Sequence, residues 1–273
     1  MRRPRVLLFD SGMGGLTVAR ATKTLIPDAD YIYAADTAAF PYGAWDEPPL
    51  VERICRVVGR VIEATAPDVV VVGCNTASTL ALAELRKRFP MPFVGTVPAI
   101  KPAAAQTKSR IIGVLATPGT VSREYTQTLI HTFAFHCRVF LHGARWLAEI
   151  AEGKLKGGKA DMETIRQEIR PVFRRREGRR TDTVVLGCTH YPLLIDELTA
   201  AAPWPVTFID PAPAIARRVK ALLGEQEARP ELREGLPPAG SVVFTSPRAM
   251  HPEQVAIYAG EGFANAIVLD LPI

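Results

Sequence analysis

Two stretches of sequence decide the fold, VVVVGCNT at residues 69–76 and TVVLGCTH at residues 183–190. Each begins with an apolar run of the kind found in strands that are covered on both faces. Each then continues with Gly-Cys and with residues that carry amide, hydroxyl or imidazole groups. Because this pattern occurs twice, we expect two half-molecules of similar architecture, each with a cysteine at the end of a strand.

Short β-branched runs alternate with helical patterns along the rest of the chain. Strands are expected at residues 6–9, 31–34, 69–72, 111–115, 139–141, 183–186, 206–209, 242–245 and 267–269, with helices that include 48–66 and 78–88. This alternation predicts an α/β fold with mostly parallel sheets. We therefore predict two pseudo-symmetric α/β domains, residues 1–98 with 209–273 and residues 99–208. Ligands of such sheets bind beyond the carboxyl ends of the strands, so the active site is expected in the cleft between the domains.

The composition is that of a folded, soluble protein. Of the 273 residues, 48% are hydrophobic and 22% are charged, which excludes intrinsic disorder, collagen and a disulfide scaffold. No apolar run is long enough to span a membrane, and Asp10 interrupts the first apolar stretch too early for a signal peptide. We therefore expect a cytoplasmic protein that does not bind membranes. The formal net charge of +5 is too diffuse to predict a nucleic-acid partner.

The four cysteines form no CxxC pair, so thiols are expected rather than disulfides. A lone cysteine is usually a small buried hydrophobe, and this role is expected of Cys55 and Cys137. Cys74 and Cys188 differ, because each follows a glycine at a strand end and precedes hydrogen-bond donors at the start of a helix. Such donors stabilise a thiolate. His190 lies two residues after Cys188 and faces the same side on extended backbone, which suits an acid or a thiol activator.

Two glycine-rich stretches resemble phosphate-binding loops without completing their motifs. DSGMGG at residues 10–15 could bind an anion at a helix start, but Thr17 stands where the dinucleotide fingerprint requires a glycine. Asp10 would repel a phosphate there, whereas it suits a thiol or a substrate ammonium group. GKLKGGK at residues 153–159 is followed by Ala160 instead of the Ser or Thr of a Walker A motif, so a surface turn is expected.

The remaining polar features predict local structure only. Ser122 is the expected N-cap of a helix. The arginine-rich stretch at residues 174–180 is expected to be a solvated helix end and loop. The other histidines show no metal-ligand spacing, so no metal site is predicted.

Taken together, four segments make the chain resemble the glutamate racemases of the aspartate/glutamate racemase family. The segments are FDSGMGGLTV at 9–18, DT at 36–37 with PYG at 41–43, GCNTAS at 73–78 and LGCTHYPLL at 186–194. Inversion of a carbon centre requires a base on one face and an acid on the other, and two cysteines meet this need if one is a thiolate and the other a thiol. The resemblance covers nearly the whole chain.

The resemblance implies a two-base interconversion of L-glutamate and D-glutamate, with no cofactor and no metal, that supplies D-glutamate for peptidoglycan. It implies that Cys74 takes the proton from D-glutamate and Cys188 takes it from L-glutamate. Asp10, His190 and Glu152 would assist these thiols as further catalytic residues. The implied substrate-binding residues are Asp10, Ser11, Tyr42, Gly43, Asn75, Thr76, Thr117, Thr120, Thr189 and His190. The expected partner is therefore a small-molecule substrate, and a homodimer stays open.

Other interpretations remain open on the sequence alone. The same scaffold could act on aspartate or another amino acid. A hydrolase with Cys188 as nucleophile and His190 as its base would leave Cys74 without a role. Two further hypotheses remain. The chain could be a non-catalytic binding protein, or Cys74 and Cys188 could form a regulatory disulfide.

Overall fold

The computed structural model describes residues 2–225, 234–269 and 271. The chain divides into two compact units, residues 1–96 with 212–273 and residues 97–211. The domain limits expected from the sequence, after residues 98 and 208, stay a prediction. Each unit contains a parallel sheet with helices on both faces, which confirms the predicted α/β class.

The first unit is built on a sheet in the order β12-β11-β2-β1-β3-β4, in which all neighbouring strands of the described residues are parallel. The strands are β1 (Arg5–Asp10), β2 (Asp30–Ala35), β3 (Val69–Val72), β4 (Phe93–Gly95), β11 (Ser241–Phe244) and β12 (Asn265–Val268). The chain therefore leaves this sheet after β4 and returns to it with β11 and β12.

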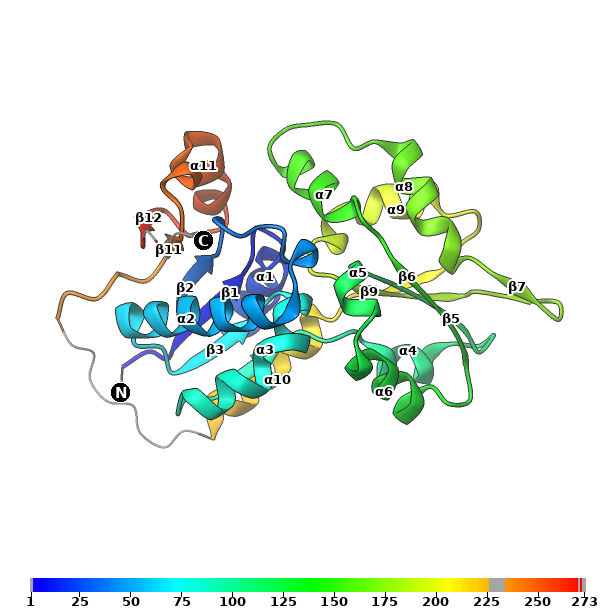
Figure 1. The fold of residues 1–273 in the computed structure, drawn as a ribbon, viewed down its shortest axis with the longest axis horizontal. Coiled ribbons are helices and arrows are strands. Elements are labelled where there is room, and N and C mark those ends of the chain that lie inside the picture. The colour runs from blue at the N-terminus through cyan, green and yellow to red at the C-terminus, as the bar shows by residue number, and fades with distance from the viewer. Residues whose placement is uncertain (1, 226–233, 270, 272–273) are drawn as a thin grey trace. The chain divides into compact units, whose positions relative to one another are not determined.

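Four of the five helices that the structure describes in the first unit pack in two pairs. The five are α1 (Leu16–Leu25), α2 (Glu47–Thr65), α3 (Asn75–Arg88), α10 (Ala212–Gly224) and α11 (Pro252–Gly260), with short 3-10 turns η1 (Tyr42–Ala44) and η4 (Pro247–Met250). Helix α2 packs on α3, and α1 packs on α10. Figure 1 shows the α2–α3 pair in front of the strands and α10 behind them. All four residues of β3 are fully buried, which explains the unbroken apolar run in the sequence.

The second unit has a smaller parallel sheet in the order β10-β9-β5-β6. Its strands are β5 (Ile111–Ala116), β6 (Arg138–Gly143), β9 (Thr183–Gly187) and β10 (Thr207–Ile209). The helices are α4 (Ile100–Gln106), α5 (Pro118–Val121), α6 (Glu124–Phe133), α7 (Leu147–Leu155), α8 (Met162–Ile169) and α9 (Ile195–Ala201), with η2 (Arg170–Val172) and η3 (Tyr191–Leu194). One core cluster joins α4 to the sheet and another joins α7, α8 and α9 to it.

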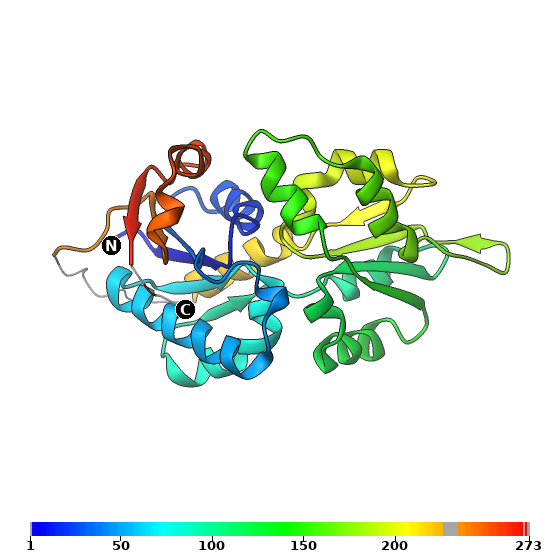
Figure 2. The same ribbon diagram turned by 45° about the horizontal axis from the view of Figure 1, so that its top comes forward.

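The arginine-rich segment is not the helix end and loop expected from the sequence. It forms an antiparallel hairpin of β7 (Arg175–Arg176) and β8 (Arg179–Arg180). Both turn residues have positive φ, 50° at Glu177 and 74° at Gly178, as a type I′ hairpin turn requires. Figures 1 and 2 both show this hairpin projecting away from the rest of its unit.

The expected N-cap at Ser122 is also wrong. Helix α6 begins at Glu124, and Ser122 instead ends the short helix α5. The hydroxyl that caps a helix here is that of Thr117, which accepts a hydrogen bond from the backbone N–H of Thr120 at 3.2 Å. Residues 153–159 form the last turn of α7 and the turn that follows it. Within the described part of the chain, no helix is both long and apolar enough to cross a membrane.

Candidate active site

The first thiol lies where two neighbouring strands of the first unit end. Phe9 of β1 pairs with Val72 of β3, so Asp10 and the Gly73-Cys74 turn leave the sheet side by side. The backbone N–H of Gly73 donates to the carbonyl of Phe9 at 2.7 Å and ties the two turns together. A Cβ at position 73 would come within 3.2 Å of the Cα of Gly15. Glycine before the cysteine therefore allows the two loops to approach each other closely.

Cys74 is the N-cap of α3, and its Sγ accepts from the backbone N–H of Ala77 at 3.5 Å. The hydroxyl of Ser11 lies 3.7 Å from the same Sγ and 3.5 Å from Oδ1 of Asp10. Asp10 is fixed in turn, because its Oδ1 accepts from the backbone N–H of Gly12 at 2.8 Å. Cys74 is only 8% exposed and Asp10 only 1%. Thiol, hydroxyl and carboxylate thus form one buried chain at the start of a helix.

Asn75 and Thr76 form the first turn of α3 beside this thiol, and both are buried. Neither side-chain amide atom of Asn75 has a hydrogen-bond partner among the described residues. Buried polar groups in folded proteins are nearly always paired, so an unpaired amide next to a buried thiol indicates a place for a ligand.

Tyr42 and Gly43 lie in η1, in the same unit. The Tyr42 hydroxyl is already engaged, because it donates to Oδ2 of Asp36 at 2.5 Å. Burial, with the negative charge of Asp36, raises the pKa of Tyr42 well above its ordinary value. The hydroxyl therefore stays protonated and holds η1 in place.

A buried ion pair supports this tyrosine, and the sequence analysis did not identify it. Arg53 of α2 donates to the two carboxylate oxygens of Asp36 at 2.6 and 2.8 Å, and Thr245 donates to the same carboxylate at 2.6 Å. The side chains of Arg53 and Asp36 are 3% and 0% exposed. One signal was available: Arg53 interrupts the apolar face of α2, where Leu50, Ile54 and Val57 recur at helical spacing.

The second thiol occupies the corresponding place in the second unit. Ala116 of β5 pairs with Gly187 of β9, so the Thr117 and Cys188 turns leave that sheet as neighbours. Sγ of Cys188 lies 3.7 Å from Nδ1 of His190, and Nε2 of His190 lies 3.1 Å from Oε1 of Glu152 in α7. The three residues are 6%, 4% and 8% exposed. Thiol, imidazole and carboxylate thus form a buried relay.

The charge state of this relay follows from its contacts. Burial opposes the charged imidazolium, but the hydrogen bonds and charges of Cys188 and Glu152 outweigh it and hold the pKa of His190 well above its ordinary value. A protonated imidazole donates from both nitrogens, to the sulfur on one side and to the carboxylate on the other. Lys156 extends the relay, with its ammonium 3.8 Å from Oε2 of Glu152.

The other expected residues of the second unit lie near these strand ends. The hydroxyls of Thr117 and Thr120 are 3.0 Å apart at the start of α5. Thr189, which stands between Cys188 and His190 in the sequence, is buried. The predicted site residues therefore fall into two groups. Asp10, Ser11, Tyr42, Gly43, Cys74, Asn75 and Thr76 belong to the first unit, and Thr117, Thr120, Glu152, Cys188, Thr189 and His190 belong to the second.

Neither group has the composition of a metal centre. Among the residues that the structure describes, no cluster of three or more histidine, cysteine, aspartate or glutamate side chains could hold a metal ion. The groups at hand are those of proton transfer: two thiols, an imidazole, carboxylates and hydroxyls.

Known proteins share this architecture. The chain is 41% identical to Escherichia coli glutamate racemase in a crystal structure with L-glutamate and the activator UDP-MurNAc-ala, with a TM-score of 0.88 and 98% of each chain covered. It is 26% identical to glutamate racemase isoform RacE1 of Bacillus anthracis, with a TM-score of 0.79 and 100% of each chain covered. A glutamate racemase of Brucella anthropi is 52% identical over 228 residues, which are 83% of this chain and 82% of that protein. Residues 17–219 match the Asp/Glu/Hydantoin racemase family, and the chain belongs to that family.

Proposed function

We propose that the chain interconverts L-glutamate and D-glutamate by a two-base mechanism. The observation that carries this proposal is that each strand-end thiol has its own buried partners for proton transfer, Ser11 and Asp10 for Cys74 and His190 with Glu152 for Cys188. A hydrolase with one nucleophilic cysteine would not need the first of these two sets. Relatives at 52% and 41% identity named glutamate racemase support glutamate as the substrate.

In this proposal one thiolate removes the α-proton and the other thiol returns a proton to the opposite face of the carbon. Cys74 acts as base towards D-glutamate and Cys188 towards L-glutamate. The helix start at Cys74 and the imidazolium at Cys188 each stabilise a thiolate. Buried donors also have to stabilise negative charge that develops next to the substrate carboxylate.

Several residues are proposed to hold the substrate. The amide of Asn75 can donate to a carboxylate through Nδ2 and accept from an ammonium group through Oδ1, which would give both of its unpaired atoms a partner. Ser11, Thr76, Thr117, Thr120 and Thr189 offer further hydroxyls, and Gly43 offers backbone. Tyr42 contributes by holding η1, because its hydroxyl is engaged by Asp36.

The wider roles follow from this activity. No step of the proposed reaction requires a cofactor, because two thiols suffice for deprotonation and reprotonation. D-Glutamate made in this way would supply peptidoglycan synthesis in the cytoplasm. The domain division at residues 98 and 208 and the assembly of a homodimer are part of the same proposal.

The test is α-proton exchange in D2O, followed by proton NMR separately from L-glutamate and D-glutamate. The wild type should exchange and racemise both enantiomers. Cys74→Ser and Cys188→Ser should each lose racemisation by at least about 100-fold, the scale of one general acid or base. Cys74→Ser should retain exchange only from L-glutamate, and Cys188→Ser only from D-glutamate.

Cys137→Ser is the matched control, since Cys137 precedes the first residue of β6 whereas Cys188 follows the carboxyl end of β9, and it should behave as the wild type. Racemisation by Cys74→Ser at the wild-type rate would refute the two-base proposal. Faster exchange of L-aspartate than of L-glutamate would refute the assignment of the substrate.

A further inference from the structure

The second unit contains an arginine-lined pocket at the edge of its sheet opposite to Cys188. The pocket has a volume of about 350 Å³, in the range of small-molecule sites. It is lined by Arg110, Ile111, Phe135, His136, Cys137, Arg138, Arg176, Glu177 and Arg179. Residues 110–111 and 137–138 lead into β5 and β6, so the pocket lies at the amino ends of these strands. Cys188 follows the carboxyl end of β9, which runs parallel to β5. Because β5 has six residues, the two places are separated by about 20 Å of strand.

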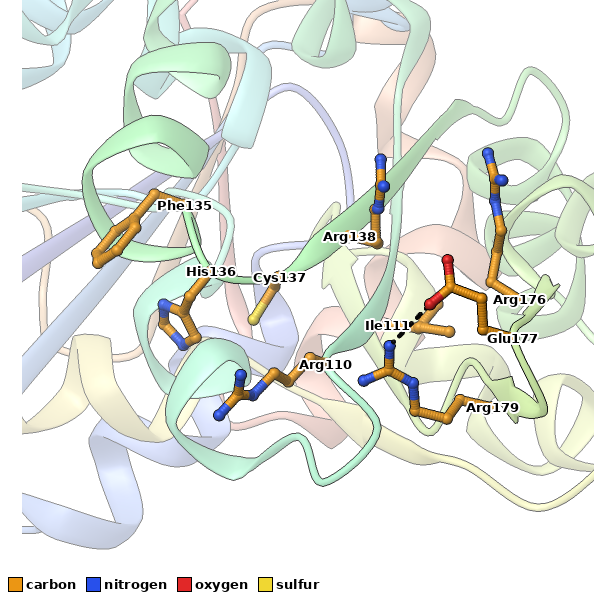
Figure 3. Close-up of a pocket in the computed structure, with 9 residues that line it drawn as sticks. All are labelled: Arg110, Ile111, Phe135, His136, Cys137, Arg138, Arg176, Glu177 and Arg179. Carbon is orange, nitrogen blue, oxygen red and sulfur yellow. Dashed lines mark hydrogen bonds and ion pairs between the residues drawn. The ribbon is translucent and has the colours of Figure 1, made fainter.

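The lining carries a strong excess of positive charge. Four arginines and one glutamate line the pocket, and that glutamate is paired with Arg179 at 3.4 Å. Figure 3 shows Arg138 and Arg176 extending their guanidinium groups to the same side, while Arg110 lies next to His136. Guanidinium groups bind phosphate oxygens through paired hydrogen bonds, so the pocket is suited to an anion with several charges.

Two of the four arginines of the hairpin lie on one of its faces and two on the other. Arg175 pairs with Arg180 across the hairpin, and both guanidinium groups lie over the ring of Trp204, at 5.0 and 5.5 Å from its centroid. Arg176 pairs with Arg179, and these two line the pocket. Like charges opposite each other on one sheet face destabilise it. An aromatic ring offsets this repulsion for the first pair, and a bound anion would offset it for the second.

Arg110 is held at the pocket by an ordered turn. It has a positive φ of 60°, which is costly for a residue with a side chain. The carboxylate of Asp182 maintains the turn, because it accepts from the hydroxyl of Thr107 at 2.6 Å and from the backbone N–H of Ser109 at 2.7 Å. The carbonyl of Arg110 accepts from the backbone N–H of Arg138 at 2.7 Å. Strained residues fixed in this way concentrate at binding sites.

An apolar surface lies at the rim of this cationic pocket. The ring of Phe135 is 80% exposed and stands edge-on to His136 at a centroid distance of 5.1 Å. An exposed ring beside a phosphate site can stack on a flat group attached to the phosphates.

We propose that this pocket binds a small molecule carrying a chain of two or more phosphates. The ligand is held by Arg110, Arg138, Arg176 and Arg179, away from the thiol of the same unit. Free polyphosphate and a nucleoside diphosphate share this chemistry, and Phe135 distinguishes them. The proposal does not depend on the proposed racemase activity.

The test is isothermal titration calorimetry of the full chain with tripolyphosphate and with ADP. Arg176→Gln/Arg179→Gln removes two charges from the pocket, and Arg175→Gln/Arg180→Gln removes two charges from the other face of the same hairpin. The pocket double variant should bind at least about tenfold more weakly, since each lost pair of hydrogen bonds to a phosphate weakens binding on that scale. The control double variant should stay within about threefold of the wild type.

Thermal unfolding midpoints of both double variants verify that they are folded. A nucleotide ligand is indicated if Phe135→Ala weakens binding of ADP but not of tripolyphosphate, and free polyphosphate if it weakens neither. Equal losses in the two double variants, or no saturable binding of either probe by the wild type, would overturn the proposal. Tighter binding of a DNA duplex than of both probes would also overturn it in favour of a macromolecular partner.

Discussion

Replacement of Arg53 by methionine should destabilise the first unit strongly. The substitution keeps the length of the side chain but removes both hydrogen bonds, at 2.6 and 2.8 Å, to the carboxylate of Asp36. Asp36 remains fully buried, with only the hydroxyls of Tyr42 and Thr245 as side-chain donors of the described contacts. A buried carboxylate without its cation is far less stable than the paired one, because hydroxyls do not replace a positive charge.

The magnitude follows from this burial. Removal of one partner from a buried ion pair costs about 3–5 kcal/mol. With a urea m-value of about 2–3 kcal/mol per M for a unit of this size, the midpoint of unfolding should fall by about 1–2 M. The loss of Arg53 should also affect the proposed site, because the Asp36 carboxylate that Arg53 binds also accepts the hydrogen bond of Tyr42 and so holds η1 in place. A weakened hold on η1 is expected to raise the KM for glutamate more than it lowers kcat.

Urea unfolding followed by circular dichroism measures the effect, with Arg20→Met as the matched control. Arg20 also pairs with a carboxylate of the first unit, Glu261, but its side chain is 49% exposed. Exposed pairs contribute less than about 1 kcal/mol, so this variant should shift the midpoint only slightly. Equal shifts for Arg53→Met and Arg20→Met would show that burial of the Asp36 pair has no energetic importance and would refute the reasoning.

Three further predictions concern the second unit and the two thiols. Glu152→Gln removes a contact that raises the pKa of His190. The stability that comes from a raised histidine pKa is present in full below the pKa of the unfolded state, about 6.5. It is lost as the pH rises through the higher pKa of the folded state. The gap in thermal stability between wild type and Glu152→Gln should therefore be widest near pH 6 and narrow towards pH 9, and a gap that grows with pH contradicts this. Iodoacetamide at pH 7 should alkylate Cys188 faster than Cys74 when each labelled peptide is quantified separately, since the two thiols are similarly exposed, at 6% and 8%, but only Cys188 lies beside an imidazole; equal rates at the two peptides would contradict an effect of His190 on the reactivity of Cys188. Gly153→Ala should raise the free energy of unfolding by about 0.5–1 kcal/mol, because a Cβ there meets nothing within 4 Å and the residue lies inside α7; a lower midpoint in urea would contradict it.

Features that depend on local sequence were predictable. The apolar runs at 69–72 and 183–186 became buried strands because nearly every residue in them fits a strand covered on both sides. The position of each cysteine after its strand was also predictable. His190 does lie beside Cys188 as expected, but residues 188–190 form a turn and not the extended backbone on which that expectation rested. Glu152, from a separate helix, was expected only because of the family resemblance, and the structure places it 3.1 Å from His190.

Contacts between residues far apart in the sequence, and the exact start of a helix, were not predictable. The Asp36–Arg53 pair joins a loop to a helix, and the only sequence signal was a charge on an apolar face. The hairpin at residues 175–180 lacks any apolar alternation, and its Glu-Gly turn is a weak signal beside Asn-Gly. Ser122 does not cap α6 because it is the C-cap of the preceding short helix α5, so α6 begins one residue later, with Arg123 as its N-cap.

Both thiols follow the carboxyl end of a parallel strand, but the charges of the side chains next to them differ. This difference suits a two-base reaction. A reaction that takes a proton on one face and returns one on the other needs one thiolate and one thiol at the start of each turnover. Cys188 lies 3.7 Å from Nδ1 of His190, whose pKa the contacts with Cys188 and Glu152 hold well above its ordinary value. Cys74 lies near the carboxylate of Asp10 through the hydroxyl of Ser11, and that negative charge opposes a second thiolate. In the mechanism proposed above, the unequal partners of the two strand ends correspond to the two directions of the reaction, with Cys188 as the base towards L-glutamate and Cys74 as the base towards D-glutamate.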